Sequence, residues 1–240
     1  MSNKMNRILQ SITIILTLVA TSSYAQGDKY KKTALQNITG SQFIHYYTRF
    51  SGSPFLIKDW VDGDVTMKSG EVYSDLQLRY DAYRDELIYF NTVNNNAIII
   101  DKNTIVGFTL KPIFGDTEHF EPMYADELHG LSGRYMAILL KDSISVIRKY
   151  EAKEDTYNTP SGNGKSAEFV HQYTTYTWNG RELSIVPKRR GAIFKQYPAH
   201  KDELRKFCFQ HHIRMKDKKS VVLLYTKINE LIKADSQAKN

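Results

Sequence analysis

The fold is decided by residues 76–110, which read LQLRYDAYRDELIYFNTVNNNAIIIDKNTIVGFTL. Short apolar runs alternate in this stretch with groups of Asp and Asn, residue types that favour turns. The runs occupy 76–80, 87–90, 97–100 and 106–110, and the breaks between them occupy 81–85, 94–96 and 101–103. Short runs separated by such brief breaks predict antiparallel strands joined by hairpins.

The same rhythm extends outward from Phe43 to Tyr197. Its apolar runs are rich in Ile, Val, Tyr and Phe, which fit a pleated and half-buried surface. Further tight turns are predicted at 68–71, at 141–142 and at Asn179-Gly180, a strong hairpin signal. Residues 111–132 contain two prolines and several acidic residues, so they are expected to form a long irregular excursion between strands.

After Pro198 the apolar residues change to a helical period. One predicted helix aligns Leu204, Phe207, Cys208 and His211. A second begins near Asp217, a residue type that caps helices, and its apolar stripe comprises Val221, Leu224, Tyr225, Ile228 and Ile232. We therefore predict a mainly β fold: an antiparallel meander with two C-terminal α-helices, α+β by strict count.

Residues 1–25 have the composition of a secretory signal peptide. Lys4 and Arg7 precede an almost uncharged apolar run over 8–20, and small residues at Ser23 and Ala25 end the segment. The apolar run is shorter than the roughly 20 residues that span a bilayer as a helix. We expect cleavage near Ala25-Gln26, a mature chain without a transmembrane segment, and a periplasmic or secreted location.

The expected organisation has four parts along the chain. After the signal peptide come an N-terminal segment at 26–40, an antiparallel β domain at 41–197, and a C-terminal helical pair at 198–240 that packs on the β domain. A loop near 158–165 is rich in Gly and polar residues and is expected to be mobile.

The charge balance is basic, with 33 Lys and Arg against 26 Asp and Glu and a formal net charge of +7. This balance favours anionic partners such as lipid headgroups, acidic glycans or nucleic acid. The basic residues are scattered, however, and their longest cluster, Lys188-Arg189-Arg190, has only three members. Export also keeps a chain away from chromosomal DNA, so nucleic acid is disfavoured as a partner.

The sequence contains few signals for chemistry. The seven histidines show none of the spacings that place two imidazoles on one metal. The single cysteine, Cys208, falls in an apolar helical pattern, where a thiol behaves as a small buried hydrophobe. Gly-rich phosphate loops, G-x-S-x-G elbows and C-x-x-C pairs are absent from the sequence. We therefore predict no catalytic residue, no metal ligand and no cofactor.

Asp81, Asp85 and Glu86 form the densest acidic group, around Tyr83. Paired carboxylates can act as acid and base when their environments separate their pKa values. These three lie at a predicted break between strands, where Asp commonly bonds the backbone and Glu keeps the surface soluble. A role in the turn is favoured, and a catalytic role is the alternative.

Aromatic residues supply the candidate binding residues: Trp60, Tyr173, Tyr176 and Trp178. Aromatic side chains on an exposed sheet face stack on sugars or contact a partner protein. In one strand, Tyr176 and Trp178 share a face while Tyr173 takes the other. Packing in the core is the competing explanation for all four.

Several short motifs are shared with a known group of proteins. They are Ser53-Pro54-Phe55-Leu56, Asp59-Trp60, Gly63, Val65, Lys68 and Gly70, followed by Leu78, Tyr80-Asp81, Tyr83 and Asp85-Glu86-Leu87. With them the chain resembles an uncharacterised family of signal-peptide-bearing proteins of Bacteroidota. The resemblance implies an exported, sheet-rich protein with a helical end, and it carries no catalytic residue.

Two functions from different classes follow. The favoured one is an exported, non-enzymatic protein that binds a protein partner or a cell-envelope component through its sheet face. The alternative is a periplasmic hydrolase-type enzyme that uses Asp81, Asp85 and Glu86. A deep pocket with convergent polar groups would favour the enzyme, whereas a flat aromatic patch would favour binding.

Export can be tested at the cleavage site. Replacing Ala25 by a bulky residue, as in Ala25→Phe, is expected to impair processing because the peptidase requires a small side chain there. N-terminal sequencing of the exported wild-type chain should begin at Gln26 or find a blocked, cyclised glutamine. Recovery of intact Met1 on a membrane-anchored product would refute the expectation.

Overall fold

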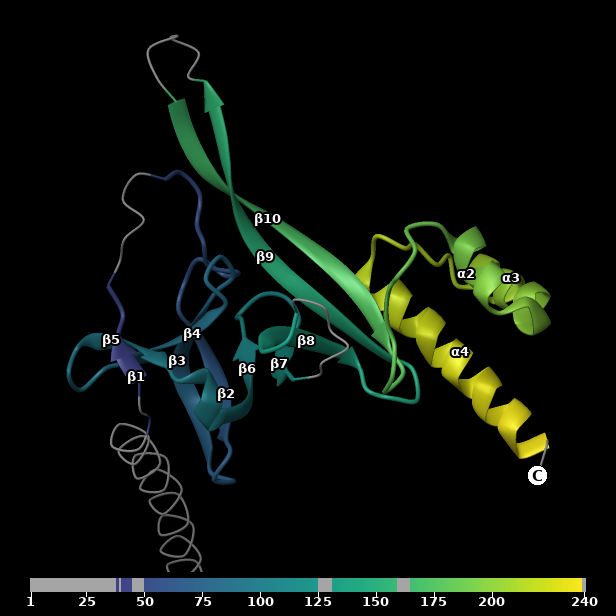
Figure 1. The fold of residues 1–240 in the computed structure, drawn as a ribbon, viewed down its shortest axis with the longest axis horizontal. Coiled ribbons are helices and arrows are strands. Elements are labelled where there is room, and N and C mark those ends of the chain that lie inside the picture. The colour runs from purple at the N-terminus through teal and green to yellow at the C-terminus, as the bar shows by residue number, and fades with distance from the viewer. Residues whose placement is uncertain (1–37, 39, 45–49, 125–130, 159–164, 239–240) are drawn as a thin grey trace, which may run out of the picture.

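The computed structural model describes residues 38, 40–44, 50–124, 131–158 and 165–238. These residues form one antiparallel sheet in the order β1-β5-β4-β3-β2-β6-β7-β8-β9-β10-β11 (Figure 1). The strands are β1 Gly40–Gln42, β2 Val61–Met67, β3 Val72–Asp81, β4 Glu86–Asn91, β5 Asn96–Ile100, β6 Ile105–Lys111, β7 Glu118–Met123, β8 Arg134–Leu140, β9 Ser145–Asn158, β10 Lys165–Trp178 and β11 Leu183–Ile185. The prediction of a mainly antiparallel β fold is confirmed.

Turn chemistry sets the ends of the hairpins. Gly70 joins β2 to β3 with a φ of 90°, which favours glycine. Between β4 and β5, the side chain of Asn91 accepts the backbone N–H groups of Val93 and Asn94 at 3.0 and 3.1 Å. The short polar side chain thus satisfies the turn backbone where no strand pairs with it.

The sheet curls until β3 and β9 meet, although they are not neighbours in the strand order. The backbone N–H of Ala152 in β9 donates to the carbonyl of Ala82, just after β3, at 3.1 Å. Residues 50–56 complete the contact. The N–H of Phe169 in β10 donates to the carbonyl of Ser51 at 3.0 Å, and the N–H of Leu56 donates to β3 at 3.0 Å. The curl therefore encloses a core.

This first core contains a cluster of aromatic rings from four strands. Tyr80 lies 5.2 Å from Phe120 and 5.9 Å from Phe108, measured between ring centroids. Phe108 and Phe120 stack at 4.7 Å, and Tyr135 meets Phe108 edge-on at 5.0 Å. All four side chains are fully buried, so their burial and ring contacts hold β3, β6, β7 and β8 together.

A second core lies under the helices at the other end of the molecule (Figure 1). The helices are α2 Arg190–Gln196, the short 3-10 turn η3 Pro198–His200, α3 Lys201–Gln210 and α4 Lys218–Ala238. Asp217 accepts the N–H of Ser220 at 2.9 Å, which matches its predicted capping role. The predicted stripe of α4 is buried from Val221 to Ile228, while Ile232 is half-buried.

Asn229 attaches α4 to the sheet. Its side-chain oxygen accepts the N–H of Ile144 at 2.8 Å, and its amide nitrogen donates to the Ile144 carbonyl at 2.9 Å. Ile144 lies in the turn between β8 and β9, so this buried amide replaces a missing strand partner there.

The structure differs from the sequence prediction in two places. Residues 111–132 are not irregular throughout, because β7 lies inside them and Pro122 pairs with Tyr135 of β8. A further helix, α2, precedes Pro198, where the pattern predicted the end of the β domain. The signal peptide and most of the 26–40 and 158–165 segments lie outside the described residues. Of the helices described, none is both long and apolar enough to cross a membrane.

The packing of α4 can be tested with two neighbouring leucines. Leu224 is fully buried and Leu223 is 41% exposed. Leu224→Ala is expected to lower the free energy of unfolding by about 2–5 kcal/mol because it leaves a cavity. Leu223→Ala, the matched control, should cost less than about 1 kcal/mol. Equal losses in denaturant melts would show that the two leucines are not packed differently.

Candidate functional site

Asp81 stabilises the turn between β3 and β4. Its carboxylate oxygen Oδ1 accepts the backbone N–H groups of Tyr83 and Arg84, both at 2.9 Å. The residue is fully buried. This is the arrangement of an Asx turn, in which an aspartate bonds the backbone two and three residues ahead.

Asp85 ends the same turn and joins β3 to two parts of the chain that are distant in sequence. Its backbone φ of 61° is left-handed, a conformation that Asp and Asn tolerate better than most residues. Oδ1 accepts the hydroxyl of Tyr80 at 2.8 Å and the backbone N–H of Tyr135 at 3.2 Å. Oδ2 pairs with the ammonium of Lys102 at 2.5 Å. The carboxylate is buried and bonds the backbone of distant Tyr135 as well as two side chains, which is more than the local backbone bonding expected of an aspartate in a turn.

Lys102 lies in the 3-10 helix η1 (Lys102–Thr104) and contacts both Asp85 and Tyr135. Its ammonium lies 4.2 Å from the ring centroid of Tyr135, a cation–π distance. Burial and the Asp85 carboxylate raise the pKa of Tyr80 and of Tyr135 well above the usual tyrosine range. Both phenols therefore stay protonated, and the Tyr135 hydroxyl has no hydrogen-bond partner among the described residues.

Glu86 is the most chemically suggestive of the three carboxylates. Burial, with the Asp81 and Asp85 carboxylates adding to it, raises the pKa of Glu86, while Arg84 and Lys102 lower it. Its buried Oε2 has no hydrogen-bond partner among the described residues. A carboxyl with a raised pKa can act as a general acid, but the two neighbouring carboxylates that would complete the pair are already bonded.

Trp60 lies in a stack with Arg79 of β3. The Arg79 guanidinium carbon is 4.4 Å from the Trp60 ring centroid and 4.6 Å from that of Phe55. Trp60 also contacts Phe90 of β4 at 5.3 Å. Burial lowers the pKa of Arg79, while Asp59 raises it. Trp60 therefore helps to cover one face of β3 and β4, away from the other three aromatic candidates.

Tyr173 faces the helices. Its hydroxyl donates to the carbonyl of Lys216 at 3.2 Å, and the guanidinium of the buried Arg148 lies 4.2 Å from its ring centroid. Arg148 also donates through Nε to Thr175 at 3.0 Å. Half of the Tyr173 residue surface remains exposed.

Tyr176 and Trp178 lie on the opposite face of β10. Tyr176 pairs directly with Ile185 of β11 and with Ile147 of β9, and Ile147 pairs in turn with Ile138 of β8. Directly paired residues of antiparallel strands share a face, so these side chains form a cross-strand row. Ile147 of this row is buried, and Ile138 lines the cavity beside α4. We name the members that keep exposed surface, Tyr176 and Ile185, together with Trp178, the outer face. Ile185 is 64% exposed.

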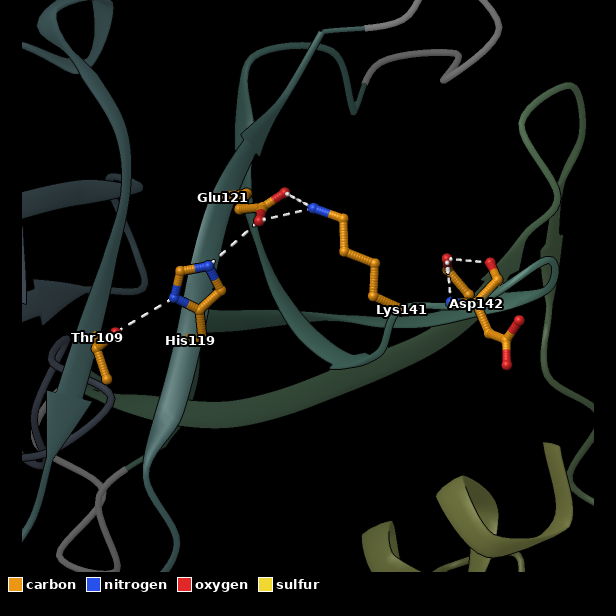
Figure 2. Close-up of polar contacts among 6 residues, drawn as sticks. Thr109, His119, Glu121, Lys141 and Asp142 are labelled. Atoms are coloured by element: carbon orange, nitrogen blue, oxygen red, sulfur yellow. Dashed lines mark hydrogen bonds and ion pairs between the residues drawn. The ribbon is translucent and has the colours of Figure 1, made fainter. Parts of the chain in front are cut away.

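A polar relay, absent from the sequence prediction, crosses β6, β7 and the β8–β9 turn (Figure 2). The Thr109 hydroxyl lies 3.2 Å from Nδ1 of His119, and Nε2 of His119 lies 3.2 Å from the Glu121 carboxylate. Lys141 bonds Glu121 at 3.2 Å, while Asp142 pairs instead with Lys233 at 2.7 Å. Hydroxyl, imidazole and carboxylate are the parts of a nucleophilic triad.

The surroundings of the relay do not suit catalysis. His119 is exposed over 44% of its side chain, and Thr109 is its direct cross-strand partner on the sheet surface. A triad gains its power in a site that excludes water and binds substrate. These contacts are those expected of neighbouring polar side chains on a solvated sheet.

A cavity of about 530 Å³ lies between α4 and the strands β7 and β8. Lys218 lines it and pairs with Glu118 at 2.6 Å and with Asp116 at 3.1 Å. Tyr150 donates to the same Glu118 carboxylate at 3.1 Å. Its charged groups neutralise one another, so the cavity offers apolar walls and no uncompensated charge for a ligand.

No protein-family model, curated protein or solved structure matches this chain. Within the described ranges, no group of three or more His, Cys, Asp or Glu side chains is placed to hold a metal ion. The sequence predicted that Asp81, Asp85 and Glu86 lie at a break between strands and that Tyr176 and Tyr173 lie on opposite faces of one strand, as the structure has them. Nothing in the sequence pattern indicated the polar relay or the contact between Arg148 and Tyr173.

The raised pKa of Glu86 predicts the sign of a pH effect. Above its folded-state pKa, the buried Glu86 carboxylate is charged and destabilises the fold; below the ordinary glutamate pKa, it is protonated in both states and costs nothing. Glu86→Gln should therefore be more stable than wild type near neutral pH, and the difference should vanish in acid. Melts in which Glu86→Gln is less stable at neutral pH would contradict this assignment.

Proposed function

We propose that this chain is an exported, non-enzymatic protein that binds a protein partner or a cell-envelope component through its outer face. The observation that carries the proposal is the cross-strand pair of Tyr176 and Ile185, with Trp178 on the same face of β10. Ile185 exposes 64% of its surface and Tyr176 and Trp178 are half-buried, so these three side chains offer an apolar and aromatic contact surface.

The bonding of the acidic cluster supports a binding role over the hydrolase alternative. Asp81 is occupied by two backbone N–H groups, and Asp85 by a hydroxyl, a backbone N–H and an ammonium. A catalytic pair needs carboxylates that are free to meet a substrate. Of the three, only Glu86 keeps an unbonded oxygen among the described residues.

Export is the second part of the proposal. It rests on the charged start, the apolar run and the small residues that end segment 1–25. Cleavage near Ala25-Gln26 would release the chain into the periplasm or the medium, where envelope components are the available partners.

Site-specific photo-crosslinking in the native cell tests the outer face. A photoreactive phenylalanine derivative at Ile185 should give a discrete adduct, and adding Tyr176→Ala should reduce it roughly 30-fold or more if Tyr176 is a binding hot spot. The matched control places the same probe at Tyr173, on the other face of β10, and should give no adduct. Melts confirm that each variant is folded. An adduct from position 173 without one from 185 would overturn the proposal.

A further inference from the structure

A groove of about 680 Å³ lies at the helical end, between α2, α3 and the loop 213–216 that leads to α4. Its walls are held in place by the second core, because Ile193 of α2 and Cys208 of α3 are buried there. The N–H of Ile213 donates to the Cys208 carbonyl at 3.0 Å, which fixes the loop against α3. The groove is therefore built on packed elements.

Six cationic side chains line the groove: Lys188, Arg189, Arg190, Arg205, Arg214 and Lys216. The described residues that line it include no carboxylate. Arg205 pairs with Asp202 at 3.8 Å between two highly exposed side chains, which is a weak contact. For the four cations outside the helices, no ion pair is found within the described parts of the chain.

Such a concentration of like charge attracts anions. Neighbouring cations repel one another, and a bound anion relieves that repulsion. Guanidinium groups present paired N–H donors that match the oxygens of a phosphate, so four arginines beside two lysines favour a phosphate over a lone carboxylate. The sequence showed only Lys188-Arg189-Arg190; the fold brings Arg205, Arg214 and Lys216 to them.

An exposed aromatic ring indicates which kind of phosphate-bearing ligand fits the groove. Phe209, at the end of α3, lines the groove and is 78% exposed, and the half-buried Phe194 and Met215 lie in the same lining. A small inorganic anion makes no use of an exposed phenyl ring. Cations beside exposed aromatic residues are the combination that binds the headgroup region of an anionic membrane.

We propose that this basic groove binds the phosphate groups of anionic phospholipid headgroups, with Phe209 entering the interfacial layer. The groove uses different residues from the outer face, so the proposal stands whether or not the outer face binds a partner. Together the two surfaces would let the chain rest on a membrane and contact a second molecule.

Vesicle binding tests the proposal directly. The exported chain, purified from the cell, is mixed with vesicles of phosphatidylglycerol and phosphatidylcholine or of phosphatidylcholine alone, and binding is measured by sedimentation. We expect binding to the anionic vesicles only, weakening as salt rises because exposed charges are screened. Phe209→Ser should weaken binding several-fold without changing its salt dependence.

The decisive comparison uses two variants with the same net charge. Lys188→Gln, Arg189→Gln and Arg214→Gln together should weaken vesicle binding roughly 100-fold, since each cation near an anionic surface contributes about 1 kcal/mol. The control removes three exposed cations from loops of the sheet, Lys58→Gln, Lys68→Gln and Arg181→Gln, and should stay within about twofold of wild type. Equal losses in both variants would overturn the proposal.

Two other outcomes would also overturn it. One is the absence of wild-type binding to anionic vesicles at low salt. The other is binding of inorganic phosphate, measured by calorimetry and lost in the groove variant, without any vesicle binding; that result would assign the groove to a free anion. Thermal melts check folding, and because all six substituted residues are exposed, both variants should melt like wild type.

Discussion

The carboxylate of Asp85 is the interaction on which the curled sheet most depends. It lies at the tight turn between β3 and β4 and receives bonds from Tyr80 of β3, the backbone of β8 and Lys102. Burying a carboxylate costs free energy unless its oxygens are bonded, so the folded chain must bring all three partners to Asp85. These bonds place β8 across the core from β3 and put the Tyr135 ring against the rings of Phe108 and Tyr80. The bonds that hold the curl therefore use the oxygens of Asp85, one of the three carboxylates that the sequence suggested as an alternative catalytic group.

The curl also separates the surfaces of the molecule. Long strands β9 and β10 extend past the rest of the sheet and carry the helices at one end (Figure 1). One face of β10 supplies Tyr173 to the helical side, and the other supplies Tyr176 to the outer face. The helices bury their apolar residues in the second core, against β8 and β9. Their basic residues therefore lie on the exposed sides of the helices. Stability is thus concentrated inside the curl and under α4, and binding is proposed for surfaces that stability does not require.

Local patterns predicted much of this fold. The alternation of Leu76, Leu78 and Tyr80 identified a strand with one buried face, and the period of Val221, Leu224 and Ile228 identified α4, because both patterns report burial directly. β7 was not predicted, because Pro122 argues against a strand. The strand forms nevertheless: Pro122 pairs with Tyr135 of β8, and the nearby Phe120 of β7 is buried in the core. The role of Asp85 could not be predicted, because its partners Tyr135 and Lys102 lie far away in sequence. The basic groove was hidden for the same reason: scattered cations become a cluster only after folding.

A double-mutant cycle on Asp85 and Lys102, followed by denaturant unfolding, tests the central claim most directly. Asp85→Asn keeps a side chain that tolerates the left-handed backbone, and Lys102→Met keeps the length of the stem, so the cycle isolates the ion pair. A structural role predicts that Asp85→Asn lowers the free energy of unfolding by about 2–4 kcal/mol, with a coupling of about 1–3 kcal/mol to Lys102. An Asp85→Asn variant as stable as wild type, with no coupling, would show that the curl does not depend on this carboxylate and would return it to the candidates for catalysis.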